Sequence, residues 1–224
     1  ALLLGQGKHR HIIDGTLCID RSRGARRFLH DRISLDRKLA TLGVPLPHAN
    51  GEPAAGHTLL QAVRAIERLA YPVVVKPVRR RQGAGVSVQV RNVEELMRAM
   101  QRAQEVSRKF IVERLVEGQT WRLLVSDHEV VGVVSGPGTD DYLDMVHSST
   151  CELARTISRD MDVGMLVLTV VTPDIGLPLV DTGGAVVDLD LAPELDRILS
   201  QDSPLWKSVT DGFIRWLYPQ GTAS

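Results

Sequence analysis

The feature that most constrains this chain is the stretch 71–86, in which three consecutive valines at 73–75 lead directly into a lysine and a proline. A β-branched run of this kind predicts a buried strand. Lys76 ends the run, and a buried ammonium is costly unless an anion meets it. Gly83, Ala84 and Gly85 follow as a turn with open backbone N–H groups. The stretch therefore fits a polyphosphate site, and it also fits a strand, a basic loop at 79–81 and a hairpin return.

The rest of the chain mixes helical and strand patterns in an order that predicts an α+β fold with mainly antiparallel pairing. Helices are expected at 34–42, after N-caps at Thr58 and Asn92, and at 149–161 and 207–217. Strands are expected at 73–75, 86–90, 110–113, 121–125, 130–134, 165–171 and 185–190. The Gly-Pro-Gly run at 136–138 marks a break between two parts of the chain.

Composition excludes several classes of function. The net charge of zero and the 4% aromatic content argue against a nucleic-acid or membrane partner. No apolar run is long enough for a transmembrane helix. Cys18 and Cys151 have no paired spacing and are expected to be reduced core thiols of a cytoplasmic protein, and the seven histidines show no ligand-like spacing. The leucine run at 2–4 resembles a strand cut into at its start, which suggests a fragment of a longer protein.

Two carboxylates near the end of the chain suggest a cation site. Asp188 and Asp190 are two residues apart in an expected strand, so both side chains lie on the same face. Neighbouring carboxylates repel unless a cation lies between them, and Mg²⁺ prefers oxygen ligands. The pair is therefore a candidate magnesium site, with a strand end entering solvent as the alternative.

Together these motifs resemble the ATP-grasp superfamily, and within it the ATP-grasp region of cyanophycin synthetases and related carboxylate–amine ligases. The resemblance covers nearly the whole chain, and the order of its motifs is more specific than any one of them. The matching motifs are Gly-Gln-Gly-Lys-His at 5–9, Gly-Val-Pro-Leu-Pro at 43–47, the stretch 71–86, Val-Glu-Arg-Leu-Val-Glu-Gly at 112–118, Arg-Leu-Leu-Val at 122–125, Val-Thr-Pro-Asp-Ile at 171–175 and Asp-Thr-Gly-Gly-Ala-Val-Val-Asp at 181–188.

The resemblance implies two α+β lobes that bind ATP in the cleft between them, and an ADP-forming reaction that joins a carboxylate to an amine through an acyl phosphate. It implies segments 1–48 leading into the fold, 49–116 as the small lobe with the glycine loop, and 117–224 as the core lobe. The residues that it marks are Lys76 on phosphate, Gly83, Ala84, Gly85 and Val86 in the phosphate loop, Glu113, Arg114, Leu115 and Val116 around adenine, Arg122 as a catalytic cation, and Asp188 and Asp190 on Mg²⁺.

The chain also departs from the family pattern around the same site. Thr169 replaces an acidic residue, Thr120 replaces the ribose-binding acid, and Arg32 stands for the lysine of an early Asp-Lys pair. The family's Glu-x-Asn has become the two aspartates, and Glu194 follows Pro193 in place of a glycine. An insertion of tens of residues, expected between 134 and 149, is missing.

Two interpretations therefore remain open, besides an unrelated α+β protein. One is a working ligase that acts on an amino acid or peptide with ATP and Mg²⁺. The other is a degenerate ATP-grasp domain that binds nucleotide or serves a structural role without ligation. The sequence does not identify the substrate, and the resemblance also allows a homo-oligomer.

Overall fold

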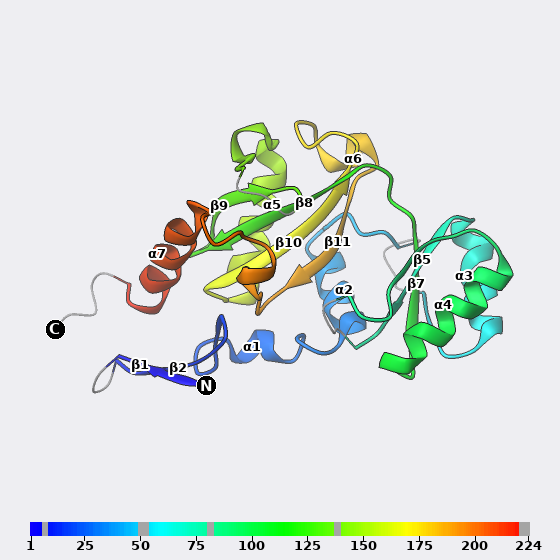
Figure 1. Cartoon of the computed structure of the whole chain (residues 1–224), viewed down its shortest axis with the longest axis horizontal. Helices are drawn as coiled ribbons and strands as arrows, with labels where there is room; N and C mark the ends of the chain where they lie inside the picture. The colour runs from blue at the N-terminus through cyan, green and yellow to red at the C-terminus, as the bar shows by residue number, and fades with distance from the viewer. Residues whose placement is uncertain (6–8, 49–53, 80–82, 137–139, 220–224) are drawn as a thin grey trace. The chain divides into compact units, whose positions relative to one another are not determined.

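The computed structural model describes residues 1–5, 9–48, 54–79, 83–136 and 140–219. These residues form two compact units (Figure 1): unit 1 comprises Ala1–Arg27 with Glu117–Ser224, and unit 2 comprises Phe28–Val116. Each unit is described by itself below. The division differs from the expected leading segment 1–48, because 1–27 packs within unit 1 and 28–48 within unit 2. Parts of the motif at 5–9, of the basic loop at 79–81 and of the break at 136–138 lie outside the described residues.

Unit 2 is a four-stranded sheet with two helices on one face. The strand order is β4 (Ala54–Gly56), β7 (Phe110–Arg114), β5 (Val73–Pro77) and β6 (Ser87–Val90). Helices α3 (Leu59–Leu69) and α4 (Val93–Val106) cover one face of this sheet, as the right-hand part of Figure 1 shows, and α2 (Arg32–Thr41) precedes β4 in the chain. The core between sheet and helices includes Val73, Val75, Leu96 and Phe110.

The local signals of unit 2 explain where its helices begin. The Asn92 side chain accepts a hydrogen bond from the Glu95 N–H and caps α4, and Leu96 lies buried on the inner face. Thr58 and Gln61 cap α3 reciprocally, in a capping box. The N-caps expected at Thr58 and Asn92 are confirmed.

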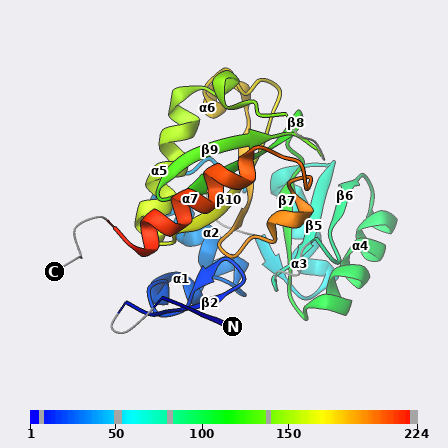
Figure 2. The same cartoon turned by 60° about the vertical axis from the view of Figure 1, so that its left-hand side comes forward.

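Unit 1 is built on a second four-stranded sheet. Its strand order is β11 (Ala185–Asp190), β10 (Met165–Thr172), β8 (Gln119–Ser126) and β9 (Glu129–Val134). Helices α5 (Ser148–Met161) and α7 (Leu205–Leu217) pack against these strands, with the short α6 (Leu179–Thr182) before β11. Figure 2 shows α7 lying across the sheet. Turns of 3-10 helix occur at Leu143–Met145 and Leu195–Arg197.

The N-terminal residues add a small sheet to unit 1. Strands β1 (Leu2–Leu4), β2 (His11–Asp14) and β3 (Leu17–Cys18) pair in that order and are followed by α1 (Arg23–Arg26). Ile13 and Cys18 belong to the same buried cluster as residues of α7, including Phe213 and Trp216. This packing ties the first residues to the far end of the chain.

All strand pairs between described residues are antiparallel, so the α+β prediction with mainly antiparallel sheets is confirmed. Across the described ranges, no helix combines the length and the apolar character needed to cross a membrane.

Candidate functional site

The lysine at the end of the valine strand is held by a buried carboxylate of the neighbouring strand. Lys76 on β5 and Glu113 on β7 lie on one face of the sheet, because Val74 is opposite Glu113 and residues two apart share a face. Lys76 Nζ is 2.6 Å from Glu113 Oε2, and 13% of the Lys76 side chain and 1% of the Glu113 side chain are exposed. The cost of burying this ammonium is therefore offset by an ion pair within unit 2.

Three further side chains extend the ion pair into a buried charged cluster. Arg32 of α2 places Nη2 3.3 Å from Glu113 Oε1 and Nε 3.4 Å from Asp36 Oδ2. Asp36 Oδ2 also lies 3.0 Å from His48 Nε2. Arg32, Asp36 and His48 are all buried. These contacts tie α2 to β7 and explain why 28–48 belongs to unit 2.

The charges of this cluster keep Glu113 ionised. Burial alone would raise the pKa of this carboxyl, but the charges of Lys76, Arg32 and His48 outweigh burial and lower its pKa below the usual value. Two permanent cations, from β5 and α2, thus converge on one carboxylate. An incoming phosphate would have to share or displace that carboxylate to reach Lys76.

The segment expected around adenine follows directly on β7. The Arg114 N–H donates to the Pro47 carbonyl at 3.0 Å, and the Leu115 N–H donates to the Pro72 carbonyl at 3.3 Å. Val116 is buried. The Arg114 and Leu115 donors are therefore already engaged inside unit 2, and Glu113 faces Lys76 and Arg32.

The glycine turn beyond β5 has the backbone that its sequence predicts. Gly83 and Gly85 both have positive φ, at 82° and 75°, which favours glycine. The Val86 N–H donates to the Gly83 carbonyl at 3.2 Å, so Gly83, Ala84, Gly85 and Val86 form one turn, and the Val86 side chain is 38% exposed. Residues 80–82 lie outside the described part of the chain.

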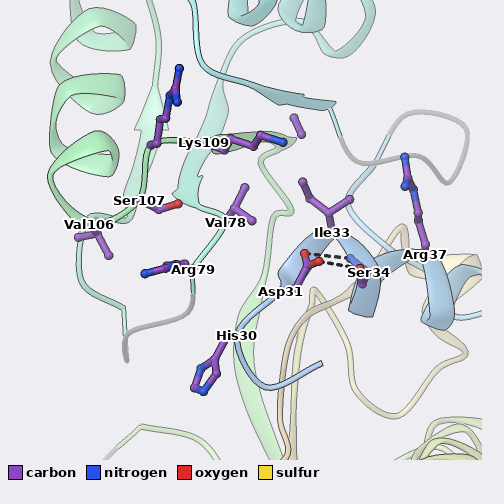
Figure 3. Close-up of a pocket in the computed structure, with 12 residues that line it drawn as sticks. His30, Asp31, Ile33, Ser34, Arg37, Val78, Arg79, Val106, Ser107 and Lys109 are labelled. Carbon is purple, nitrogen blue, oxygen red and sulfur yellow. Dashed lines mark hydrogen bonds between the residues drawn. The ribbon is translucent and has the colours of Figure 1, made fainter. Parts of the chain in front are cut away.

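A basic pocket of about 840 Å³ opens where β5 ends (Figure 3). Val78, Ile33 and Val106 provide apolar wall, and the Val78 backbone is fixed at both ends by Arg32 and Lys109. The ionisable side chains that line it, in the described part of the chain, are His30, Asp31, Arg37, Arg79, Arg108 and Lys109. Asp31 is the one carboxylate among these described residues, and it caps α2 by accepting from the Ser34 N–H and hydroxyl. The pocket therefore favours an anion.

In unit 1, three residues that the sequence singled out, Arg122, Thr169 and Asp188, form a row across the sheet. Thr169 on β10 lies directly opposite Arg122 on β8 and directly opposite Asp188 on β11. Side chains at directly paired positions share a face, so an arginine, a threonine and an aspartate stand side by side. Asp190 is opposite Val167, two residues along the same face, and its Oδ1 accepts from the Ala192 N–H at 3.1 Å.

This row decides whether Mg²⁺ fits. Asp188 and Asp190 offer carboxylate oxygens on one face, which suits a hard cation. Thr169 occupies the position beside Asp188 with a neutral hydroxyl, and Arg122 brings a positive charge to the same row. The residues present therefore fit a divalent cation held by two aspartates, without a third carboxylate at Thr169.

The predicted site residues fall into two groups, one in each unit. Lys76, the glycine turn and the segment 113–116 belong to unit 2, whereas Arg122, Asp188 and Asp190 belong to unit 1. Within unit 2 the structure brings the side chains of Lys76 and Glu113 into direct contact. Within unit 1, Arg122 and Asp188 lie on either side of Thr169, on the two strands that flank β10.

Sequence reasoning missed Asp36 and His48, which support the charged cluster. Both are separated from Glu113 by more than sixty positions, and neither sits in a recognisable motif. One signal was present. Asp36 follows Arg32 by four residues on an expected helix, so the two charges share a helix face.

Comparisons with known proteins agree with this fold. The sequence model of the family described as D-ala D-ala ligase C-terminus matches residues 42–139. A cyanophycin synthetase of Nostoc sp. (strain PCC 7120 / SAG 25.82 / UTEX 2576) is 33% identical over 135 residues, which are 60% of this chain and 14% of that protein. A cyanophycin synthetase of Synechocystis sp. (strain ATCC 27184 / PCC 6803 / Kazusa) is 23% identical over 303 residues, covering 99% of this chain and 34% of that protein.

The chain thus spans about a third or less of the length of these curated relatives. The second alignment runs over 303 positions, whereas this chain has 224 residues, so several tens of the relative's positions have no counterpart here. Among solved structures, the RimK domain protein ATP-grasp from Sphaerobacter thermophilus DSM 20745 matches with a TM-score of 0.63 at 21% identity. That match covers 85% of this chain and 67% of the other. At this level of identity the likeness concerns the fold.

Proposed function

Since this chain belongs to the ATP-grasp superfamily, we propose that it binds ATP and works as an ADP-forming ligase that joins a carboxylate, of an amino acid or peptide, to an amine. The observation that carries the proposal is the convergence of Lys76 and Arg32 on Glu113, since Lys76 lies on β5, the strand that precedes the glycine turn. Cations held rigidly at such a turn favour a polyphosphate, and positioning of charge is most of what phosphoryl transfer requires.

In the proposed reaction, a substrate carboxylate oxygen attacks the terminal phosphorus of ATP, forming an acyl phosphate and releasing ADP. The amine then attacks the acyl carbon, and the C–O bond to phosphate breaks, giving an amide and free phosphate. Lys76 and the turn of Gly83 and Gly85 would hold phosphate oxygens, and Arg122 would face the transferred group. Asp188 and Asp190 would hold Mg²⁺, which when bound offsets the charge of the phosphates.

A second candidate function is favoured by one observation, the neutral Thr169 in the row between Arg122 and Asp188. A hydroxyl at this position does not hold a metal ion as a carboxylate does. In this alternative the chain does not ligate: it binds nucleotide, weakly or without regard to Mg²⁺, or it serves as a structural or interaction module.

The experiment that separates the two functions measures ADP release from ATP and Mg²⁺ with a panel of amino acids and short peptides as carboxylate and amine donors. Hydroxylamine added to the reaction would trap an acyl phosphate as a hydroxamate. The ligase predicts ADP release that depends on both donors and falls sharply in Lys76→Ala. It predicts no fall in Lys207→Ala, which alters a lysine of unit 1 that is 84% exposed.

Binding of ATP without ADP release by any donor pair would favour the second function. The absence of any ATP binding would contradict the ligase and would leave only the structural or interaction role of the second function.

A further inference from the structure

The first hairpin of unit 1 brings a histidine, a cysteine and an aspartate together. Ile13 on β2 is paired with Cys18 on β3, and Gly15 makes the turn between them with a φ of 60°. His11 Nδ1 lies 2.8 Å from Asp20 Oδ2, and Cys18 Sγ lies 3.4 Å from Asp20 Oδ1. The three donor atoms all lie within 4.8 Å of one another. A nitrogen, a sulfur and an oxygen donor therefore converge on a small volume.

The hairpin holds these donors in place. The Ile12 N–H donates to Asp20 Oδ1 at 2.8 Å, and the Ile19 N–H donates to the Ile12 carbonyl at 2.8 Å. The His11 ring packs edge-on against Tyr218, with ring centroids 5.3 Å apart. Cys18 is buried, whereas the His11 side chain is 16% exposed and the Asp20 side chain 33%. The donors are thus fixed on one side and reachable from solvent on the other.

The three side chains of the cluster are linked by hydrogen bonds whose protons a metal ion would replace. Both His11 and Cys18 bind the same carboxylate through a proton, one on each of its oxygens. Asp20 Oδ1 also accepts a hydrogen bond from the Ile12 N–H. One carboxylate therefore stands between the two softer donors.

A second group of potential ligands in this chain differs in one respect. Asp36, His48 and Glu113 also lie close together, but Arg32 and Lys76 already balance their two carboxylates. A divalent ion there would meet two fixed cations. For Asp20, among the described residues, the ion pair is with His11, a side chain that is neutral when it binds a metal.

We propose that His11, Cys18 and Asp20 form a binding site for a divalent transition metal, with Zn²⁺ as the best match. Zinc binds imidazole nitrogen, thiolate sulfur and carboxylate oxygen together, and sites with three protein ligands keep a fourth position for water. A thiolate ligand disfavours Mg²⁺ and Ca²⁺, which take oxygen ligands. On binding, the thiol proton of Cys18 and the Nδ1 proton of His11 pass to solvent, and His11 coordinates through Nδ1 as a neutral imidazole that carries its proton on Nε2.

This site lies in unit 1 on residues that the proposed ligase does not use, so the proposal of a metal site does not depend on that function. It also runs against the expectation from sequence that no histidine has ligand-like spacing. That expectation treated His11 and Cys18 as unrelated, whereas the hairpin turn folds them onto each other.

The test is a titration of the reduced, metal-free chain with cobalt chloride, followed by competition with zinc chloride. A thiolate-to-cobalt charge-transfer band in the near ultraviolet is expected, and zinc should abolish it. Cys18→Ser should remove the band, and His11→Gln should weaken cobalt binding by about tenfold or more. Cys151→Ser, which changes the other buried cysteine of the chain, should leave both the band and the affinity unchanged.

The proposal is overturned if the wild-type chain gives no thiolate band, or if the band survives in Cys18→Ser. It is also overturned if Cys151→Ser removes the band. His11→Gln, at a position whose side chain is 16% exposed, keeps the test decisive should Cys18→Ser fail to fold, because cobalt binding unaltered by His11→Gln contradicts the site.

Discussion

Replacing Glu113 by glutamine should destabilise unit 2 strongly. The substitution keeps the shape of the side chain but removes the charge that Lys76 and Arg32 share, at distances of 2.6 and 3.3 Å. The Glu113 side chain is only 1% exposed, so water does not replace the lost charge. Removing one partner of a buried ion pair costs about 3–5 kcal/mol, because the remaining charge stays buried. That is a large share of the ~5–15 kcal/mol by which a typical domain is stable.

The assay is amide hydrogen exchange read by mass spectrometry on peptides that cover β5 and β7. All three tryptophans, Trp121, Trp206 and Trp216, lie outside unit 2, so tryptophan fluorescence would not report on it directly. A loss of about 3–5 kcal/mol in opening free energy should speed exchange of the slowest amides by roughly two to three and a half orders of magnitude. Glu105→Gln makes the same chemical change at an exposed position of α4 and should leave exchange within about twofold.

The same variant should also change how stability depends on pH. The pKa of Glu113 is lowered in the folded protein, so its contribution is present above its unfolded value of 4.5 and is lost as pH falls through the lower folded value. The wild-type chain should therefore lose stability as pH falls below about 4.5, and Glu113→Gln should lose less over that range.

Two results would refute this reasoning. One is an exchange rate in Glu113→Gln that matches the Glu105→Gln control. The other is strict additivity with Lys76→Met, because side chains in direct contact should show a coupling energy of about 0.5–3 kcal/mol.

Three further predictions concern two positions of unit 1 and the N-cap of α4. Thr169→Asp places a third carboxylate beside Asp188, so it should lower the stability of the protein without Mg²⁺ and make ATP binding more dependent on Mg²⁺. If calorimetric titrations show an unchanged Mg²⁺ dependence of ATP binding, the placement of the metal is wrong. Asn92→Ala removes the α4 cap and should lower the free energy of unfolding, measured in urea by circular dichroism, by about 0.5–2 kcal/mol. An unchanged free energy of unfolding would show that the cap does not stabilise the helix. Gly118→Ala, at a φ of 125° and against the Thr172 backbone, should cost at least roughly 1–3 kcal/mol of strain, and a thermal midpoint equal to that of the wild-type chain would argue against this close approach.

Much of the fold could be predicted from local patterns. The valine run at 73–75 and the apolar strands at 165–171 and 185–190 are recognisable as buried strands from their residue types. The side chain of Asn92 marks the start of its helix. The short strands β2 and β3 were missed, because elements of four and two residues carry too little pattern. The Asp14-Gly15 pair that joins them is a hairpin signal and could have revealed them.

The candidate site could likewise be predicted only in part, where its residues belong to local motifs. Residue types and spacing pointed to Lys76, the glycine turn and the two aspartates, since each belongs to a local motif. Contacts between distant segments could not be predicted in this way, because nothing near Glu113 in sequence indicates that Arg32 and Lys76 meet its carboxylate. The pairing of Thr169 with both Arg122 and Asp188 likewise follows from strand register, which the sequence alone leaves open.

The most direct test of the account is the affinity of the chain for ATP in the presence of Mg²⁺, measured by isothermal titration calorimetry on the wild-type chain, Lys76→Ala and Lys207→Ala. Wild type and Lys207→Ala should bind ATP alike, and Lys76→Ala should lose about 1.5–3 kcal/mol of binding free energy, the scale of a charged hydrogen bond. Equal affinities in all three proteins, or no binding by the wild-type chain, would contradict it.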